Sequence, residues 1–269
     1  MQALATGTLT EQTGTVRQVV SARMPTKWGT FRLLGFERDV SSGSHRVDSA
    51  LAIVLGDLSH GAPLLRIHSQ CLIGEAFGSL RCDCNEQLEI AMRAIATERR
   101  GIIIYDHQEC RSVGLMAELQ TCALQDAGLD VVDAYQALGF MAECRDFGFP
   151  AAILHKLGIS HVRLLSNNPD KARALVEAGV EVLAQVPCEA VPNTHSIAYL
   201  RAKKEKLGHT LSVVGIGQSL QSICAMMRSI DTEISNGQDR EQFEFSSVAA
   251  ATDLDDTLTE SASRRTIAS

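Results

Sequence analysis

Three cysteines, Cys71, Cys82 and Cys84, lie close together in the sequence. Thiolates are soft ligands that bind zinc, and the Cys-x-Cys spacing lets two sulfurs reach one ion. The loop between Cys71 and Cys82 can bring the third sulfur back to the same ion. Three protein ligands leave a fourth position open, as in catalytic zinc sites, where zinc activates water near neutral pH. The spacing therefore predicts a catalytic zinc site formed by these three thiolates.

Two other interpretations fit the same spacing. Three buried cysteines could lie together without a metal, or His68 could close a structural site as a fourth ligand.

The chain has eight cysteines, but at 269 residues it is too long to need disulfide staples. We therefore expect reduced thiols. Since the first residues lack the basic start and apolar run of a signal peptide, we also expect a cytoplasmic protein.

The composition excludes several classes of protein. Hydrophobic residues make up 45% of the chain and charged residues 21%, which is typical of a soluble globular protein. A net charge of −7 disfavours nucleic acid as a partner, and no long apolar run predicts a membrane span. A few converging arginines can still bind a small anion, so an anionic small-molecule substrate fits the composition.

Apolar runs and helical spacings alternate along the chain. Strands are predicted at 30–37, 50–55, 64–68, 102–105, 161–165 and 180–186, and helices at 85–100, 113–127, 147–157 and 169–178, with a basic helix ending at 203–208. This order predicts an α/β domain with a mixed sheet flanked by helices. We divide the chain into a flexible lead-in at 1–22, a catalytic domain at 23–210, and a C-terminal helix with a disordered acidic tail at 211–269.

The zinc segment belongs to a longer pattern. Residues 66–88 read RIHSQCLIGEAFGSLRCDCNEQL, residues 105–115 read YDHQECRSVGL, and residues 163–169 read RLLSNNP. In order and spacing, these segments resemble the signatures of the GTP cyclohydrolase II family, and the similarity covers roughly residues 23–210.

This resemblance implies a GTP cyclohydrolase II-like fold, a homodimer, and one zinc ion per subunit held by the three cysteines. It implies an enzyme that opens the imidazole ring of GTP at C8, releases that carbon as formate and removes pyrophosphate with magnesium on the triphosphate, for riboflavin synthesis. Arg145 would be the nucleophile on the α-phosphorus and Glu143 the general base. The implied nucleotide-contacting positions are Arg66, His68, Ser69, Gln70, Gln87, Glu109, Cys110, Arg111, Ser166 and Lys171.

The residue types suit those roles. Guanidinium groups such as Arg111 and Arg145 match phosphate oxygens, and an amide at Gln87 or a carboxylate at Glu109 can read the donors and acceptors of a guanine edge. Without the resemblance, surface salt bridges and solvated loop residues would be the default interpretation of these side chains.

Several positions depart from the family's pattern. Glu143 replaces an aspartate, Cys110 a glycine, Val131 a threonine and Cys122 a tyrosine. Cys122 shares a predicted helix face with Leu115 and Leu119, so we expect it to be a small core residue.

The loss of the phenol at position 122 removes a group that could transfer a proton. We therefore hypothesise that the enzyme retains the formyl carbon in its product. Two broader alternatives stay open: a ring-opening hydrolase acting on another purine or pyrimidine nucleotide in a specialised pathway, and a catalytically silent nucleotide-binding sensor.

Overall fold

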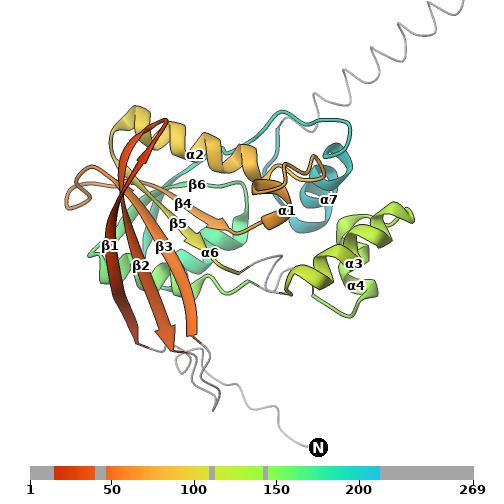
Figure 1. The fold of residues 1–269 in the computed structure, drawn as a ribbon, viewed down its shortest axis with the longest axis horizontal. Helices are drawn as coiled ribbons and strands as arrows, with labels where there is room; N and C mark the ends of the chain where they lie inside the picture. Colours follow the sequence, from red (N-terminus) through yellow and green to blue (C-terminus); the bar gives the residue numbers. More distant parts are fainter. Residues whose placement is uncertain (1–14, 40–46, 109–112, 142–144, 213–269) are drawn as a thin grey trace, which may run out of the picture. The chain divides into compact units, whose positions relative to one another are not determined.

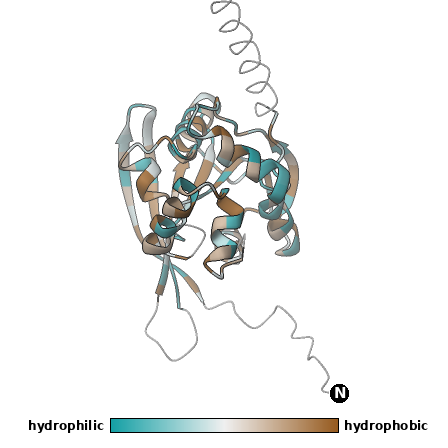
Figure 2. Ribbon diagram, turned by 90° about the vertical axis from the view of Figure 1, so that its right-hand side faces the viewer, coloured by the Kyte–Doolittle hydropathy of each residue, from teal (hydrophilic) through white to brown (hydrophobic). Residues whose placement is uncertain are grey.

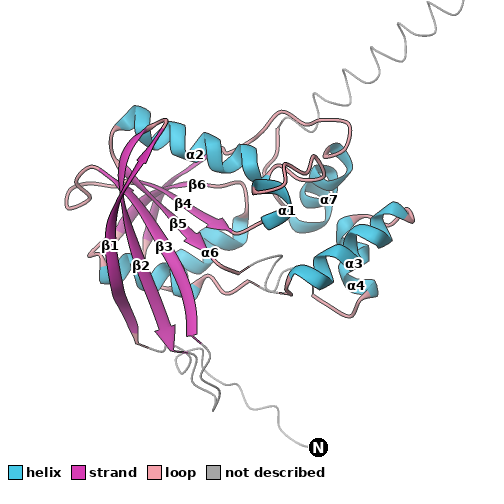
Figure 3. Ribbon diagram, in the orientation of Figure 1, coloured by secondary structure: helices cyan, strands magenta, loops and turns pink. Residues whose placement is uncertain are grey.

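The computed structural model describes residues 15–39, 47–108, 113–141 and 145–212, all within the first of the chain's two compact units, Met1–Gln218. The strands of this part are β1 (Val16–Thr26), β2 (Gly29–Asp39), β3 (Val47–Leu55), β4 (Leu64–Ser69), β5 (Gly101–Asp106), β6 (His161–Leu165) and β7 (Glu181–Val186). The helices are α1 (Leu72–Glu75), α2 (Cys84–Glu98), α3 (Leu115–Asp126), α4 (Val131–Ala137), α5 (Gly148–Lys156), α6 (Pro169–Glu177) and α7 (Ile197–Leu207) (Figures 1 and 3).

The strands form one mixed sheet in the order β1-β2-β3-β5-β4-β6-β7, which confirms the predicted fold class. Strands β1, β2, β3 and β5 pair antiparallel, whereas β5, β4, β6 and β7 pair in parallel. The carboxyl ends of β4, β5 and β6 therefore meet at one edge of the sheet. Ligand sites of α/β sheets lie at this edge, and the chain runs on from β4 into Cys71 and from β6 into Ser166.

Helices cover both faces of the sheet, and the strands bury side chains on both faces as a result. In β5, Ile102 and Ile104 belong to the core cluster that includes Phe149 and Ile153 of α5, while Ile103 belongs to the cluster that includes Ile95 of α2. A strand buried on both faces reads as a continuous apolar run rather than an alternating one. Figure 2 shows brown and teal bands along the helices, as expected of helices that bury one side only.

Side-chain caps fix the starts of two helices. The Asn168 side chain accepts a hydrogen bond from Asp170 N, and Pro169 occupies the first turn of α6, as the sequence predicts. The Asp130 side chain accepts from Val132 N and Asp133 N and so caps α4. Helix α4 was not predicted from the sequence, although Asp130 before an apolar pair was a signal for it.

The first strand begins inside the predicted flexible lead-in. Residues 16–22 belong to β1, which pairs antiparallel with β2, so the domain starts before residue 23. Most side chains of β1 are exposed. A strand exposed on both faces shows no alternation of apolar and polar residues, and for this reason no local pattern predicts β1.

Helix α3 buries a different face from the predicted one. Ala117 and Thr121 are buried, whereas Leu119 is 45% exposed and Cys122 is half-buried. The interpretation of Cys122 as a core residue beside Leu119 is therefore wrong. Thr121 tolerates burial because its Oγ1 donates a hydrogen bond to Ala117 O over 2.9 Å.

The folded domain also extends past the predicted boundary at residue 210. Leu211 is buried against Leu200 of α7, and Thr210 N donates to Asn167 O over 3.0 Å. From residue 213 on, the predicted C-terminal helix and acidic tail lie outside the described residues. In the described part, no helix is both long and apolar enough to span a membrane.

Candidate active site

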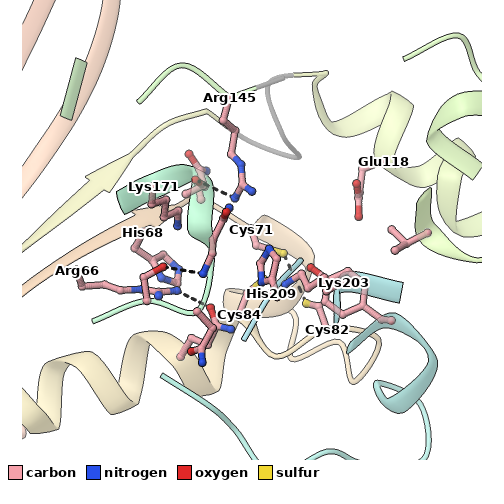
Figure 4. A pocket seen from close by; sticks show the side chains of 18 of the residues that line it. Arg66, His68, Cys71, Cys82, Cys84, Glu118, Arg145, Lys171, Lys203 and His209 are labelled. Carbon is pink, nitrogen blue, oxygen red and sulfur yellow. Dashed lines mark hydrogen bonds between the residues drawn. The ribbon is translucent and has the colours of Figure 1, made fainter. Parts of the chain in front are cut away.

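The three predicted zinc ligands lie together at the carboxyl edge of the sheet. Cys71 directly precedes α1, and Cys84 is the first residue of α2 (Figure 4). The Sγ atoms of Cys71, Cys82 and Cys84 lie within 4.8 Å of one another. Within the described ranges, this is the one group of three or more metal-ligating side chains that is so close.

The donor set of this thiol cluster fits a zinc ion. With Zn–S bonds of about 2.3 Å, two ligands of a tetrahedral ion lie about 3.8 Å apart, and Cys71 Sγ lies 3.8 Å from Cys82 Sγ. The hydrogen bond between these two thiols lowers the pKa of Cys82 to about 4 and raises the pKa of Cys71. Three sulfurs at this spacing are a ligand set that zinc prefers over harder metals such as magnesium.

Gly74 makes the close approach of the three sulfurs possible. A Cβ atom at Gly74 would lie 2.8 Å from Cys82 Sγ and 3.2 Å from Cys71 Sγ. Any larger residue at position 74 would push the sulfurs apart. Glycine at this position therefore belongs to the metal site although it donates no ligand atom.

Glu75 positions Cys71 by a hydrogen bond to its backbone nitrogen. Its Oε1 accepts a hydrogen bond from Cys71 N over 2.8 Å and lies 3.1 Å from His68 Nε2, and its Oε2 accepts from Tyr105 OH over 2.8 Å. Although burial acts in the opposite direction, hydrogen bonding from His68 lowers the pKa of Glu75, and burial lowers the pKa of His68. His68 is thus engaged with Glu75 and does not join the thiol cluster, so the structure gives no support to a zinc site closed by His68.

Positive side chains line the same pocket as the thiol cluster. Arg66 and Lys171 are each only 4% exposed. Arg66 Nη1 donates to Leu165 O over 3.1 Å, and Lys171 Nζ donates to Ile67 O over 2.8 Å. Arg145 Nη1 lies 3.4 Å from Ser69 Oγ at the end of β4. These cations make the pocket suited to an anionic ligand such as a phosphate ester.

Gln87 links the cations to the cysteine segment. Its Oε1 accepts a hydrogen bond from Arg66 Nη2, and its Nε2 donates to Asp83 Oδ2 over 2.5 Å. Both polar ends of the amide are therefore bonded to protein. This arrangement orients Arg66, and the predicted reading of a guanine edge by Gln87 stays a prediction.

The segment that carries Arg145 is fixed by Gln108. Gln108 Oε1 accepts from Asp146 N over 2.7 Å, and Gln108 Nε2 donates to Asp146 O over 2.6 Å. The side chain of Asp146 accepts in turn from Arg38 Nη2 over 2.8 Å. Arg38 belongs to β2, so the backbone beside Arg145 is anchored to the sheet.

One pocket brings together most of the predicted site residues, from segments far apart in the sequence. It is lined by Arg66, His68, Ser69, Gln70, Cys71, Cys82, Cys84, Gln87, Arg145, Ser166 and Lys171. The predicted residues Glu109, Cys110, Arg111 and Glu143 lie outside the described residues.

Other residues that line the pocket were not predicted as site residues from the sequence. They are Glu118, Val131, Tyr135, Asn167, Asn168, Tyr199, Lys203 and His209. Asn167 and Asn168 were visible in the RLLSNNP segment, and Val131 as a departure from the family's pattern. The remaining five lie on α3, α4 and α7 or just after α7, and only the fold brings those elements to the pocket.

Changing Gly74 to alanine should weaken metal binding. The added methyl group would overlap two ligand sulfurs, so we expect zinc affinity, measured by competition with a chromophoric chelator, to fall at least about 10-fold. Gly78→Ala is the control, because a Cβ there meets nothing within 4 Å and the change costs only backbone strain at φ +66. Equal zinc affinity in Gly74→Ala and the wild type would contradict this role.

Comparisons with known proteins show the family of the chain. A sequence profile described as GTP cyclohydrolase II matches residues 17–187. The GTP cyclohydrolase-2 of Shigella dysenteriae serotype 1 is 45% identical over 198 residues, which cover 73% of this chain and 98% of the relative. That of Buchnera aphidicola subsp. Acyrthosiphon pisum is 45% identical over 195 residues, which cover 72% and 98%.

Among solved structures, a two-domain 3,4-dihydroxy-2-butanone 4-phosphate synthase from A. baumannii matches with a TM-score of 0.38 and 22% identity. The match covers 67% of this chain and 41% of that one. The similarity to that structure is too low to add to the argument. By the sequence profile and the two curated relatives, the chain belongs to the GTP cyclohydrolase II family and is a hydrolase of that type.

Proposed function

We propose that this enzyme hydrolyses the imidazole ring of GTP at C8 and removes pyrophosphate from the same nucleotide. The observation that carries the proposal is the presence of the thiol cluster in one pocket with Arg66, Arg145 and Lys171. A ligand that contacts both the thiol cluster and these cationic side chains must combine a hydrolysable group with a strongly anionic one. GTP meets that requirement, and the matching relatives are named for it.

The residues divide the chemistry between them. Zinc held by Cys71, Cys82 and Cys84 would supply a Lewis acid that activates water for attack on C8. Arg145 would bond to the α-phosphorus as pyrophosphate leaves, a role that follows the family resemblance. Glu143, which lies outside the described residues, would be the general base, a role that also follows the family resemblance. Lys171 would bind phosphate oxygens as the negative charge shifts to the leaving group.

The endpoint of the reaction depends on proton transfer in the second hydrolysis. Cys122 is not among the residues that line the pocket, and burial raises the pKa of its thiol, which makes it a poor proton donor. Tyr135 does line the pocket, and its hydroxyl donates to Glu118 Oε2. Because this phenol of α4 lines the pocket, we favour release of formate over the formyl-retaining product that the missing tyrosine suggested.

Further parts of the proposal rest on the family and on ligand chemistry. Magnesium would accompany the triphosphate, whose oxygens are the ligands it prefers. The chain would act as a homodimer, in a reducing compartment such as the cytoplasm, where thiols stay available for metal. Its product would enter riboflavin synthesis. Hydrolysis of another purine or pyrimidine nucleotide is the nearest alternative, since the shape of the pocket does not by itself select guanine.

Zinc-loaded protein incubated with GTP and magnesium tests the proposal. We expect one pyrophosphate and one formate per GTP, with a diaminopyrimidine nucleotide detected by mass spectrometry. Cys71→Ser should abolish formate release, because a hydroxyl is a poor zinc ligand at neutral pH. Binding of GTP with no turnover would favour the sensor instead, and a product that still carries the formyl carbon would assign the divergence to the second hydrolysis.

Changing Gln108 to alanine should slow pyrophosphate release without weakening zinc binding. It removes both hydrogen bonds that hold the backbone beside Arg145, so we expect kcat for pyrophosphate release to fall about 10- to 100-fold with zinc affinity unchanged. Stopped assays for pyrophosphate, run beside chelator competition for zinc, measure both. A parallel loss of zinc affinity would mean that Gln108 supports the whole pocket rather than Arg145.

A further inference from the structure

Helix α7 places a buried lysine against the cysteine segment. Lys203 is only 9% exposed, and its Nζ lies 3.5 Å from Asp83 Oδ1 and 4.2 Å from the centre of the Tyr199 ring. Asp83 is 3% exposed and is the residue between the ligands Cys82 and Cys84. Figure 4 shows Lys203 close to Cys82.

The Asp83 carboxylate depends on this lysine. Its Oδ2 accepts a hydrogen bond from Gln87 Nε2, whereas Oδ1 is buried and accepts no hydrogen bond within the described residues. A buried charge without a partner is costly, and Lys203 supplies the opposite charge. The pair therefore restrains the turn that sets the two sulfurs of the Cys-x-Cys segment.

The charge of the site gives Lys203 a second effect. Three thiolates and one Zn²⁺ carry a net charge of about −1, which a nearby ammonium group stabilises. Groups that orient metal ligands without contacting the metal change metal affinity by about 10- to 100-fold.

We propose that Lys203 is a positioning residue of the zinc site: acting through Asp83, it holds the Cys82–Cys84 turn in the geometry that binds metal, and so makes α7 part of the site. The inference rests on the zinc site of the proposed function but not on GTP as substrate. It does not require contact between Lys203 and the nucleotide.

Zinc affinity of the full chain, measured without nucleotide by competition with a chromophoric chelator, tests this role. Lys203→Met keeps the apolar stem and removes the charge, and should weaken zinc binding about 10-fold or more, whereas Lys203→Arg should keep most of the affinity. Lys204→Met is the matched control, since Lys204 is the exposed neighbour on the same helix. Thermal unfolding of the zinc-free proteins checks that each variant is folded.

A second variant tests whether Lys203 acts through Asp83. Asp83→Asn preserves shape and the bond to Gln87, and in that background Lys203→Met should change zinc affinity much less than in the wild type. This comparison stays informative if Lys203→Met is less stable, because both variants share that change.

Two results would overturn the proposal. The first is wild-type zinc affinity in Lys203→Met, which together with a raised KM for GTP would make Lys203 a nucleotide contact. The second is an equal effect of Lys203→Met with and without Asp83, which would exclude action through that carboxylate. If the wild type bound zinc but did not turn over GTP, only the proposed substrate would fail; if it bound no zinc, both would fall.

Discussion

The convergence of three sulfurs around Gly74 is the constraint on which the site depends. The chain leaves strand β4, makes the short helix α1 and returns to the start of α2. The sulfurs come within 4.8 Å because the residue facing them, Gly74, has no side chain. Glu75 secures one side of this turn through Cys71 N. On the other side Lys203 faces Asp83. The metal site is thus built from backbone shape as much as from its ligands.

The sheet topology supplies the rest of the pocket. Because β4, β5 and β6 run in parallel, the residues that follow them gather at one edge, where thiols and cations meet. Two of these cations donate to backbone carbonyls: Arg66 to Leu165 O and Lys171 to Ile67 O. A contact with a neutral carbonyl orients a positive charge toward the pocket, which suits a phosphate chain.

Elements with a local sequence signal could be predicted before the structure was known. Buried strands such as β5 show as apolar runs, Pro169 marks the start of α6, and the cysteine spacing predicted the three thiols that lie within 4.8 Å of one another. Other features depend on tertiary contacts. Strand β1 has no buried face to create a pattern. Helix α3 buries Ala117 in place of the more apolar Leu119. Lys203 and Tyr135 reach the pocket from helices whose position no local pattern fixes.

The central claim is that three cysteine thiolates hold zinc with one coordination position left open in a nucleotide pocket. X-ray absorption at the zinc edge of the purified, zinc-loaded protein tests it most directly. The account predicts three sulfur ligands at about 2.3 Å and one oxygen or nitrogen ligand at about 2.0 Å, the latter changing when a nucleotide binds. Four sulfur ligands, or a shell that does not respond to nucleotide, would contradict it and indicate a closed, structural zinc site.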